Sequence, residues 1–165
     1  MHWLRNILKI TDPYKIILLT PLIFVLHVAE EFPSFVNWVN GIISDGITQN
    51  MFLVVNITGF VITIFLSIFM AISKDEIAVI LNLAWLSFLM FANGLFHLLA
   101  TVAYGYSPGV VTSIVLYLPY FVWFVWSLIS KKTLSSMTIG ITIAIGSLPM
   151  FLHGYMIIFE GRTLF

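Results

Sequence analysis

Residues 51–73 read MFLVVNITGFVITIFLSIFMAIS, and this stretch decides the fold class. It contains no aspartate, glutamate, lysine or arginine, and it is long enough for an α-helix to cross the roughly 30 Å hydrocarbon core of a bilayer. A polar turn, Lys74-Asp75-Glu76, follows it directly. The stretch therefore predicts a transmembrane helix that ends at this turn.

Outward from this helix, the chain carries four more apolar segments of similar length, separated by short polar or proline- and glycine-containing turns. The whole chain of 165 residues is 61% hydrophobic and 8% charged, which no soluble domain of this size could bury. We therefore predict an all-α, polytopic membrane helical bundle that forms a single integral membrane domain over residues 1–165. Its five predicted spans are 14–32, 51–73, 77–103, 110–130 and 134–159.

Two shorter segments have helical patterns without enough apolar length to span a membrane. Residues 2–10 place apolar and polar side chains on opposite helical faces, which predicts an N-terminal interfacial helix. Residues 34–50 alternate apolar side chains with asparagine and serine, which predicts a surface helix after the first span. Asp12-Pro13 has the composition of a helix start.

Basic residues fall almost entirely on one side of a five-span arrangement. The positive-inside rule then places the N-terminus in the cytoplasm and the C-terminus outside. We expect a multi-pass protein of the plasma membrane of a prokaryote, and a homo-oligomer remains open. The residues on the cytoplasmic side are Arg5, Lys9, Lys15, Lys74, Lys131 and Lys132, against Arg162 on the other.

Charge and cysteine content exclude several classes of function. Seven basic and seven acidic residues give a formal net charge of zero, so we expect no nucleic acid among the partners. Cysteine is absent, which excludes disulfides and thiolate metal sites. Any metal would have to be held by histidine and carboxylate side chains.

Histidines and glutamates converge in one layer of the predicted bundle. His27, Glu30 and Glu31 stand at positions i, i+3 and i+4, so they share one helical face. Spans one, three and five run in the same direction, and His97 and His153 fall in the same outer half as His27. Ionisable groups are costly inside a bilayer, so such a layer indicates a functional site.

These donors predict a site for one or two divalent transition metal ions, with zinc or iron the best match and calcium and copper(I) disfavoured. Glu31 is also the candidate general base, if it stays free of the metal. A metal-free acid–base site made of the same side chains remains open. The predicted ligands are His27, Glu30, Glu31, His97 and His153, and the residues predicted to support them or contact a substrate are Asn93, Asn56, Tyr106 and Tyr117.

The residues in this layer also resemble a known family. HVAEE at residues 27–31 is similar to the motif of the HXXEE-domain proteins, and Tyr106-Ser107-Pro108-Gly109 resembles the YxPG motif of that family, with His97 twelve residues before Gly109. The resemblance covers most of the chain and implies a multi-pass membrane protein. It implies no activity, because the function of that family is unknown.

Three functions remain open at the level of sequence. The leading one is a membrane-embedded, metal-dependent enzyme, a hydrolase or oxidoreductase, that acts on a lipid or other hydrophobic small molecule near the outer leaflet. The second is a metal-free, isomerase-like enzyme in which His and Glu transfer protons on a lipid- or sterol-like substrate. The third is a small transporter or ligand-binding membrane protein, although a transporter needs a polar path through both leaflets.

Overall fold

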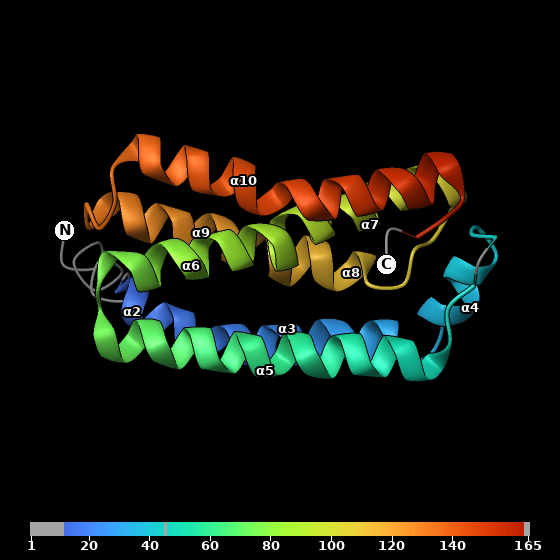
Figure 1. The fold of residues 1–165 in the computed structure, drawn as a ribbon, viewed down its shortest axis with the longest axis horizontal. Helices are drawn as coiled ribbons and strands as arrows, with labels where there is room; N and C mark the ends of the chain where they lie inside the picture. Colours follow the sequence, from blue (N-terminus) through green and yellow to red (C-terminus); the bar gives the residue numbers. More distant parts are fainter. Residues whose placement is uncertain (1–11, 45, 164–165) are drawn as a thin grey trace.

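The computed structural model describes residues 12–44 and 46–163, and Figure 1 shows long helices lying side by side along one axis. Within these residues, five helices are long and apolar enough to cross a membrane, which confirms the predicted all-α architecture with five spans. The predicted interfacial helix at 2–10 lies outside the described residues. The five spans are Pro13–Glu31, Gln49–Ser73, Glu76–Tyr104, Val110–Ser130 and Ser136–Glu160.

The first span combines α2 (Pro13–Ile16), a turn of 3-10 helix, η1 (Ile17–Leu19), and α3 (Thr20–Glu31). The Asp12 side chain accepts a hydrogen bond from the Tyr14 amide, and Pro13 occupies the first turn, so the predicted helix start is confirmed. The span ends two residues before Pro33, and the short helix α4 (Phe35–Asn40) then lies across one end of the bundle (Figure 1).

The second span, α5 (Gln49–Ser73), begins at the Thr48 cap and ends at Lys74, whose φ of 55° lets the chain reverse. Asp75 then caps α6 (Glu76–Leu86) by accepting from the Ala78 amide at 2.7 Å. Only 17% of the second span is buried, so most of α5 presents its apolar side chains outward, as a lipid-facing helix does.

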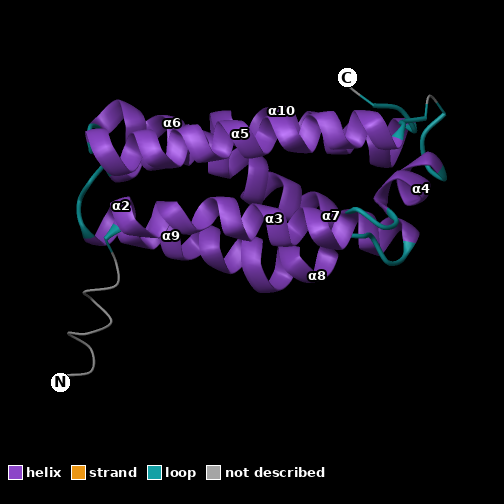
Figure 2. Cartoon of the chain, turned by 90° about the horizontal axis from the view of Figure 1, so that it is seen from below, coloured by secondary structure: helices purple, strands orange, loops and turns teal. Residues whose placement is uncertain are grey.

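The third span is the central element of the bundle, and 56% of an apolar 18-residue stretch within it is buried. It consists of α6, a π-helical segment η2 (Ser87–Ala92) and α7 (Asn93–Tyr104). Seen from below, α6 and α7 lie in different layers of the bundle, so this span crosses from one layer to the other (Figure 2). The wide turns of η2 lie at the crossing.

The last two spans also contain π-helical segments. The fourth is α8 (Val110–Thr112), η3 (Ser113–Tyr117) and α9 (Leu118–Ser130), and the fifth is α10 (Ser136–Tyr155) followed by η4 (Met156–Glu160). Helix α10 packs closely on α6, where Gly146 lies so near that a Cβ on it would be 2.5 Å from the Ala84 carbonyl oxygen. The close packing of α10 on α6 therefore needs glycine at position 146.

The bundle has two halves along its axis, and they differ in polarity. The half that holds α2, α6 and α9 is built around a buried cluster that includes Leu83, Leu86 and Phe124. Asn82 lies inside it, and its amide donates to the carbonyl oxygens of Leu66 and Ala78. We call this the apolar half. The other half, which holds α4, α7 and α8, contains His27, His97 and His153 and is called the site half below.

Candidate metal centre

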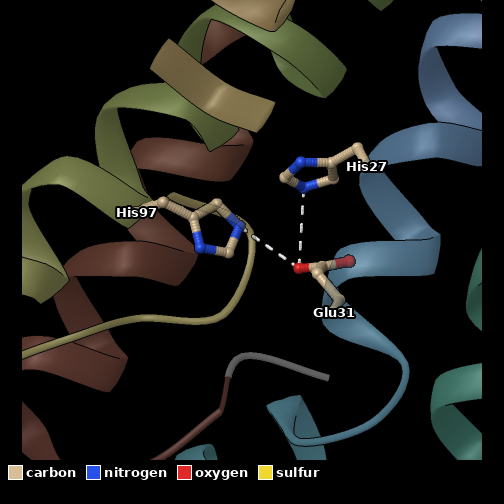
Figure 3. Close-up of side chains that lie close together, drawn as sticks. All are labelled: His27, Glu31 and His97. Carbon is tan, nitrogen blue, oxygen red and sulfur yellow. Dashed lines mark ion pairs between the residues drawn. The ribbon is translucent and has the colours of Figure 1, made fainter. Parts of the chain in front are cut away.

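Three buried side chains meet in the site half. His27 and Glu31 come from α3, one helical turn apart, and His97 comes from α7 (Figure 3). The Glu31 Oε1 atom lies 3.6 Å from His27 Nε2 and 3.2 Å from His97 Nε2. One ligand atom from each residue lies within 4.8 Å of the other two, and all three residues are buried, so the group could hold a metal ion.

His27 is oriented by a chain of hydrogen bonds on its far side. Its Nδ1 lies 2.8 Å from Thr112 Oγ1, and that hydroxyl lies 2.6 Å from Glu30 Oε2. Because the hydroxyl proton goes to the nearby carboxylate, the oxygen accepts from His27 Nδ1–H. This leaves the Nε2 lone pair of His27 directed toward Glu31. Carboxylate, hydroxyl and imidazole form the kind of relay that fixes metal-binding histidines.

His97 is held in a similar way. Its Nδ1 lies 3.0 Å from Ser107 Oγ, in the loop between α7 and α8. Its Nε2 is one of the buried side-chain atoms without a hydrogen-bond partner among the described residues. The 3.2 Å separation from Glu31 Oε1 places this nitrogen within ion-pairing distance of the carboxylate. A nitrogen and a carboxylate oxygen at this distance could bind the same metal ion.

Gly109 closes the site on one side. Its φ of 98° is in the region that favours glycine, and it directly precedes α8. A Cβ at this position would lie 2.8 Å from His97 Cε1, 2.9 Å from His27 Cε1 and 3.0 Å from His97 Nε2. Both imidazoles therefore rest against the Gly109 backbone, and any side chain there would displace them.

Aromatic rings form the walls around the two histidines. The Tyr117 ring stacks on His27 with a centroid separation of 4.0 Å, and the two imidazoles meet edge to face at 5.0 Å. Phe35 and Phe96 pack on His97 at 6.1 and 5.2 Å. These contacts keep the imidazole planes fixed and exclude water from the group.

Glu30 lies beside this group rather than in it. Its carboxylate accepts hydrogen bonds from the backbone amides of Val111 and Thr112, from the Thr112 hydroxyl and from the Tyr106 hydroxyl. Partial burial and the bond to Glu30 raise the pKa of Tyr106 above its ordinary value, so the phenol remains a donor at neutral pH. Glu30 thus joins α3 to α8 and to the loop before it.

A cavity of about 190 Å³ adjoins two of the three side chains, those of His27 and Glu31. His27, Glu31 and Asn93 form part of its wall, and most of the remaining wall is apolar. Its sides come from α5 and α10, and Phe35 and Val39 of α4 lie at one end. The metal group therefore faces an apolar chamber.

The other predicted site residues lie around this chamber. His153 on α10 and Asn56 on α5 line the cavity, and Asn56 donates to the Phe52 carbonyl of its own helix at 2.9 Å. Asn93 lies 3.3 Å from His27 Nε2. His153 and Glu30 are outside the group of three whose ligand atoms lie within 4.8 Å.

Thr112, Ser107 and Gly109 contact the histidines, and sequence reasoning gave them no role. Ser107 and Gly109 lie within the YxPG motif, so the motif was a signal, but its letters do not say what they touch. Thr112 contributes one hydroxyl group to the first turn of an otherwise apolar span. Its contacts with His27 and Glu30 join residues far apart in sequence, and a spacing rule cannot find such contacts.

These features define a class: a multi-pass helical membrane protein with a buried His–Glu–His group beneath one end of its bundle. A family model described as "protein of unknown function with HXXEE motif" matches residues 18–124, about two thirds of the chain. The chain belongs to this HXXEE family, as the resemblance of its motifs indicated. No curated protein and no solved structure matches it.

Proposed function

We propose that this protein is a membrane-embedded metalloenzyme that acts on a lipid or other hydrophobic substrate. In this proposal, His27, His97 and Glu31 hold one divalent transition metal ion, zinc or iron. The observation that carries the proposal is the convergence of two imidazole nitrogens on one carboxylate oxygen, at 3.2 and 3.6 Å, in a buried site. Two histidines and one carboxylate are a ligand set shared by hydrolytic zinc sites and non-haem iron sites.

The spacing of the donor atoms supports a single ion. Ligand atoms about 2.1 Å from a tetrahedral zinc are about 3.4 Å apart, and the two distances to Glu31 Oε1 lie on either side of that value. Three protein ligands leave one coordination position open. The metal would supply Lewis acidity at that position or lower the pKa of a bound water molecule.

Residues around the three ligands have supporting roles in this proposal. Thr112 and Glu30 hold the His27 ring in the tautomer that presents Nε2, and Ser107 fixes the orientation of the His97 ring through its Nδ1. We therefore assign Glu30 to orienting His27, and His153 to the wall of the substrate chamber, although both were expected as ligands. The fourth position would face the chamber, where Asn93 is placed to orient a substrate oxygen.

The chemistry would take place near the outer face of the membrane. Lys15, Lys74 and Lys131 lie near the ends of spans in the apolar half, and the positive-inside rule assigns that end to the cytoplasm. The site half and its chamber would then lie in the outer leaflet. A substrate at that depth is apolar for most of its length.

A metal-free acid–base enzyme is the second candidate, and one observation favours it. The Asn93 amide is within 3.3 Å of His27 Nε2, so this lone pair has a donor available without any ion. In that case Glu31 and the two histidines would share protons and transfer them to and from the substrate.

Elemental analysis by mass spectrometry on detergent-purified protein, prepared without chelator, separates the two candidates. We expect close to one equivalent of zinc or iron in the wild type and background levels in His97→Ala and Glu31→Gln, because each removes one of three ligands. The element present decides between hydrolytic and oxidative chemistry. Background metal in the wild type would overturn the proposal and favour the acid–base enzyme.

Two matched variants make this result specific. His153→Ala removes a histidine from the chamber wall and should retain the metal, since this residue is outside the group of three. Asn82→Ala removes a buried polar side chain in the apolar half and should also retain it. Metal loss in either variant at unchanged elution from a sizing column would contradict the assigned ligand set.

A further inference from the structure

We infer that the chamber binds a single-chain amphiphile with an uncharged hydroxyl or carbonyl head. This molecule enters the chamber from the bilayer, between α5 and α10. This inference deepens the proposed function by naming the substrate class of the same site. It rests on the cavity and its surroundings, and it makes a prediction about binding that does not require a bound metal.

The path of the third span explains why a cavity exists at this place. Helix α6 packs against both α5 and α10, but it ends at Leu86, and the chain then crosses into the other layer (Figure 2). Beyond that point, α5 and α10 lie at opposite edges of the bundle (Figure 1). The cavity fills the interval between them, and both helices contribute to its lining.

The α5 side of the cavity is also a lipid-facing surface. Val55 and Met51 line the cavity, yet 60% and 47% of their surfaces are exposed on the outside of the bundle. A residue that lines a cavity and is exposed at the same time lies at an opening. Because the outside of a spanning helix is hydrocarbon, this opening leads into the bilayer.

The far end of the chamber is covered. Phe35 and Val39 of α4 line it there, and Val39 is buried. Ile157 of η4 lies on the same side and is also buried. A ligand that reaches the polar wall therefore arrives from the side, through apolar surroundings, which selects molecules already dissolved in the membrane.

The volume limits how much of the ligand is enclosed. A cavity of 150 Å³ in another protein accommodates benzene, so about 190 Å³ holds a polar head and a few carbon atoms. The rest of an acyl or isoprenoid chain would extend through the opening past Val55. A molecule with two chains would need a second exit, so the inference is restricted to single chains.

The charges of the residues that line the cavity determine whether the head group of the ligand is charged or uncharged. Among the described residues that line the cavity, none is lysine or arginine, and the one carboxylate is Glu31. Arg162 precedes the lining residue Thr163 in sequence, and it is paired with Glu160 at 2.6 Å. In the metal-free chamber, an anionic phosphate head would be desolvated beside a carboxylate, with no lysine or arginine in the lining to receive it. An uncharged head can instead form hydrogen bonds with Asn93 and His153.

Photo-crosslinking on the detergent-purified full-length protein tests the inference. The probe is hexadecanol with a diazirine a few carbons from the hydroxyl, and labelled positions are mapped by mass spectrometry. We expect saturable labelling of the α5 and α10 residues that line the cavity, competed by plain hexadecanol. In chelator-treated protein, a hexadecyl phosphate probe with the same diazirine should label these positions about tenfold less.

Neighbouring valines on α5 provide the matched control. Val55→Trp places a large ring in the opening and should reduce the labelling about tenfold. Val54 is exposed to a similar degree, at 63%, but does not line the cavity, so Val54→Trp should leave the labelling unchanged. Equal effects of both substitutions, or labelling spread without competition over other exposed apolar residues, would overturn the inference.

The labelling experiment and the metal analysis test the ligand inference and the proposed metalloenzyme separately. Cavity labelling in protein that holds no metal would support this inference while overturning the proposed metalloenzyme. Stoichiometric metal without cavity labelling would do the reverse. Preferential labelling by the phosphate probe would overturn the uncharged head.

Discussion

Tyr117 and Tyr120 lie three residues apart on the fourth span, and both are buried, yet their hydroxyls have opposite surroundings. The Tyr120 hydroxyl is 2.6 Å from Thr20 Oγ1 and donates to the Ile16 carbonyl at 2.9 Å. The Tyr117 hydroxyl has no hydrogen-bond partner among the described residues, and its ring stacks on His27. One turn of the fourth span therefore separates a tyrosine that joins helices from a tyrosine that contacts the site.

A similar contrast separates four other buried polar residues, two in each half. In the apolar half, Asn82 and Ser87 donate to backbone carbonyls of the helices they join or belong to, so their polar atoms serve the packing. In the site half, His27 and His97 use one nitrogen for a hydroxyl partner and direct the other toward Glu31. The side chains of Asn82 and Ser87 are thus paired, whereas each site histidine directs one nitrogen to the carboxylate. Ser67 on α5 is an exception, because its buried hydroxyl has no partner among the described residues.

Gly109→Ala is expected to have the largest effect on this contrast. The new methyl group would press on both imidazoles at 2.8–3.0 Å, and the Gly109 backbone cannot move away without displacing α8. We expect bound metal to fall to background levels, measured by elemental mass spectrometry as for the ligand variants.

Gly105→Ala is the control for backbone strain. Gly105 also has a positive φ, of 83°, but a Cβ there would meet nothing within 4 Å. Its substitution should lower stability by about 1–3 kcal/mol and leave metal content unchanged. If Gly105→Ala lost the metal equally, contact with the histidines would not be the reason that position 109 needs glycine.

Thr112→Val tests the relay behind His27 and should have an intermediate effect. The substitution keeps the side-chain shape but removes the hydroxyl between His27 Nδ1 and Glu30. Loss of such a partner weakens metal binding by about 10–100-fold, which a chelator competition titration would measure. Thr112→Ser restores the hydroxyl and should recover most of the affinity. Wild-type affinity in Thr112→Val would show that the relay does not orient His27.

Tyr120→Phe and Tyr117→Phe give the smallest and most direct comparison of the two halves. Tyr120→Phe removes two hydrogen bonds and should cost about 1–2 kcal/mol of unfolding free energy. Tyr117→Phe removes a hydroxyl without a partner and should change stability by less than about 0.5 kcal/mol. Unfolding in mixed detergent micelles measures both. Equal losses would contradict the distinction between the halves.

Much of the architecture follows from the sequence. The stretch at residues 51–73 is uncharged and apolar, and the observed helix Gln49–Ser73 begins and ends within two residues of it. Span number and length depend on local composition, because a bilayer requires every spanning backbone to be helical over about 20 residues. The pairing of His27 with Glu31 was equally local, since it depends on one turn of one helix.

The contacts between His27, Glu31 and the residues of other helices could not be predicted from local sequence spacing. Glu30 and Glu31 are adjacent in sequence, but only Glu31 meets both histidines, while Glu30 turns toward Thr112 and Tyr106. The rotation of α3 against α7 and α8 makes that choice. His153 has the depth expected of a ligand but lies on the cavity wall, because α10 packs on α6 rather than on α3.

The sequence by itself determined that this chain forms five apolar spans and that His27 and Glu31 share one helical face, because length, polarity and helical spacing are local properties. Only the tertiary structure decided which nitrogen of each histidine faces Glu31, why Gly109 must lack a side chain, and where a chamber opens between α5 and α10. These depend on helix rotation and on the crossing at residues 87–92, which arise from packing between distant segments.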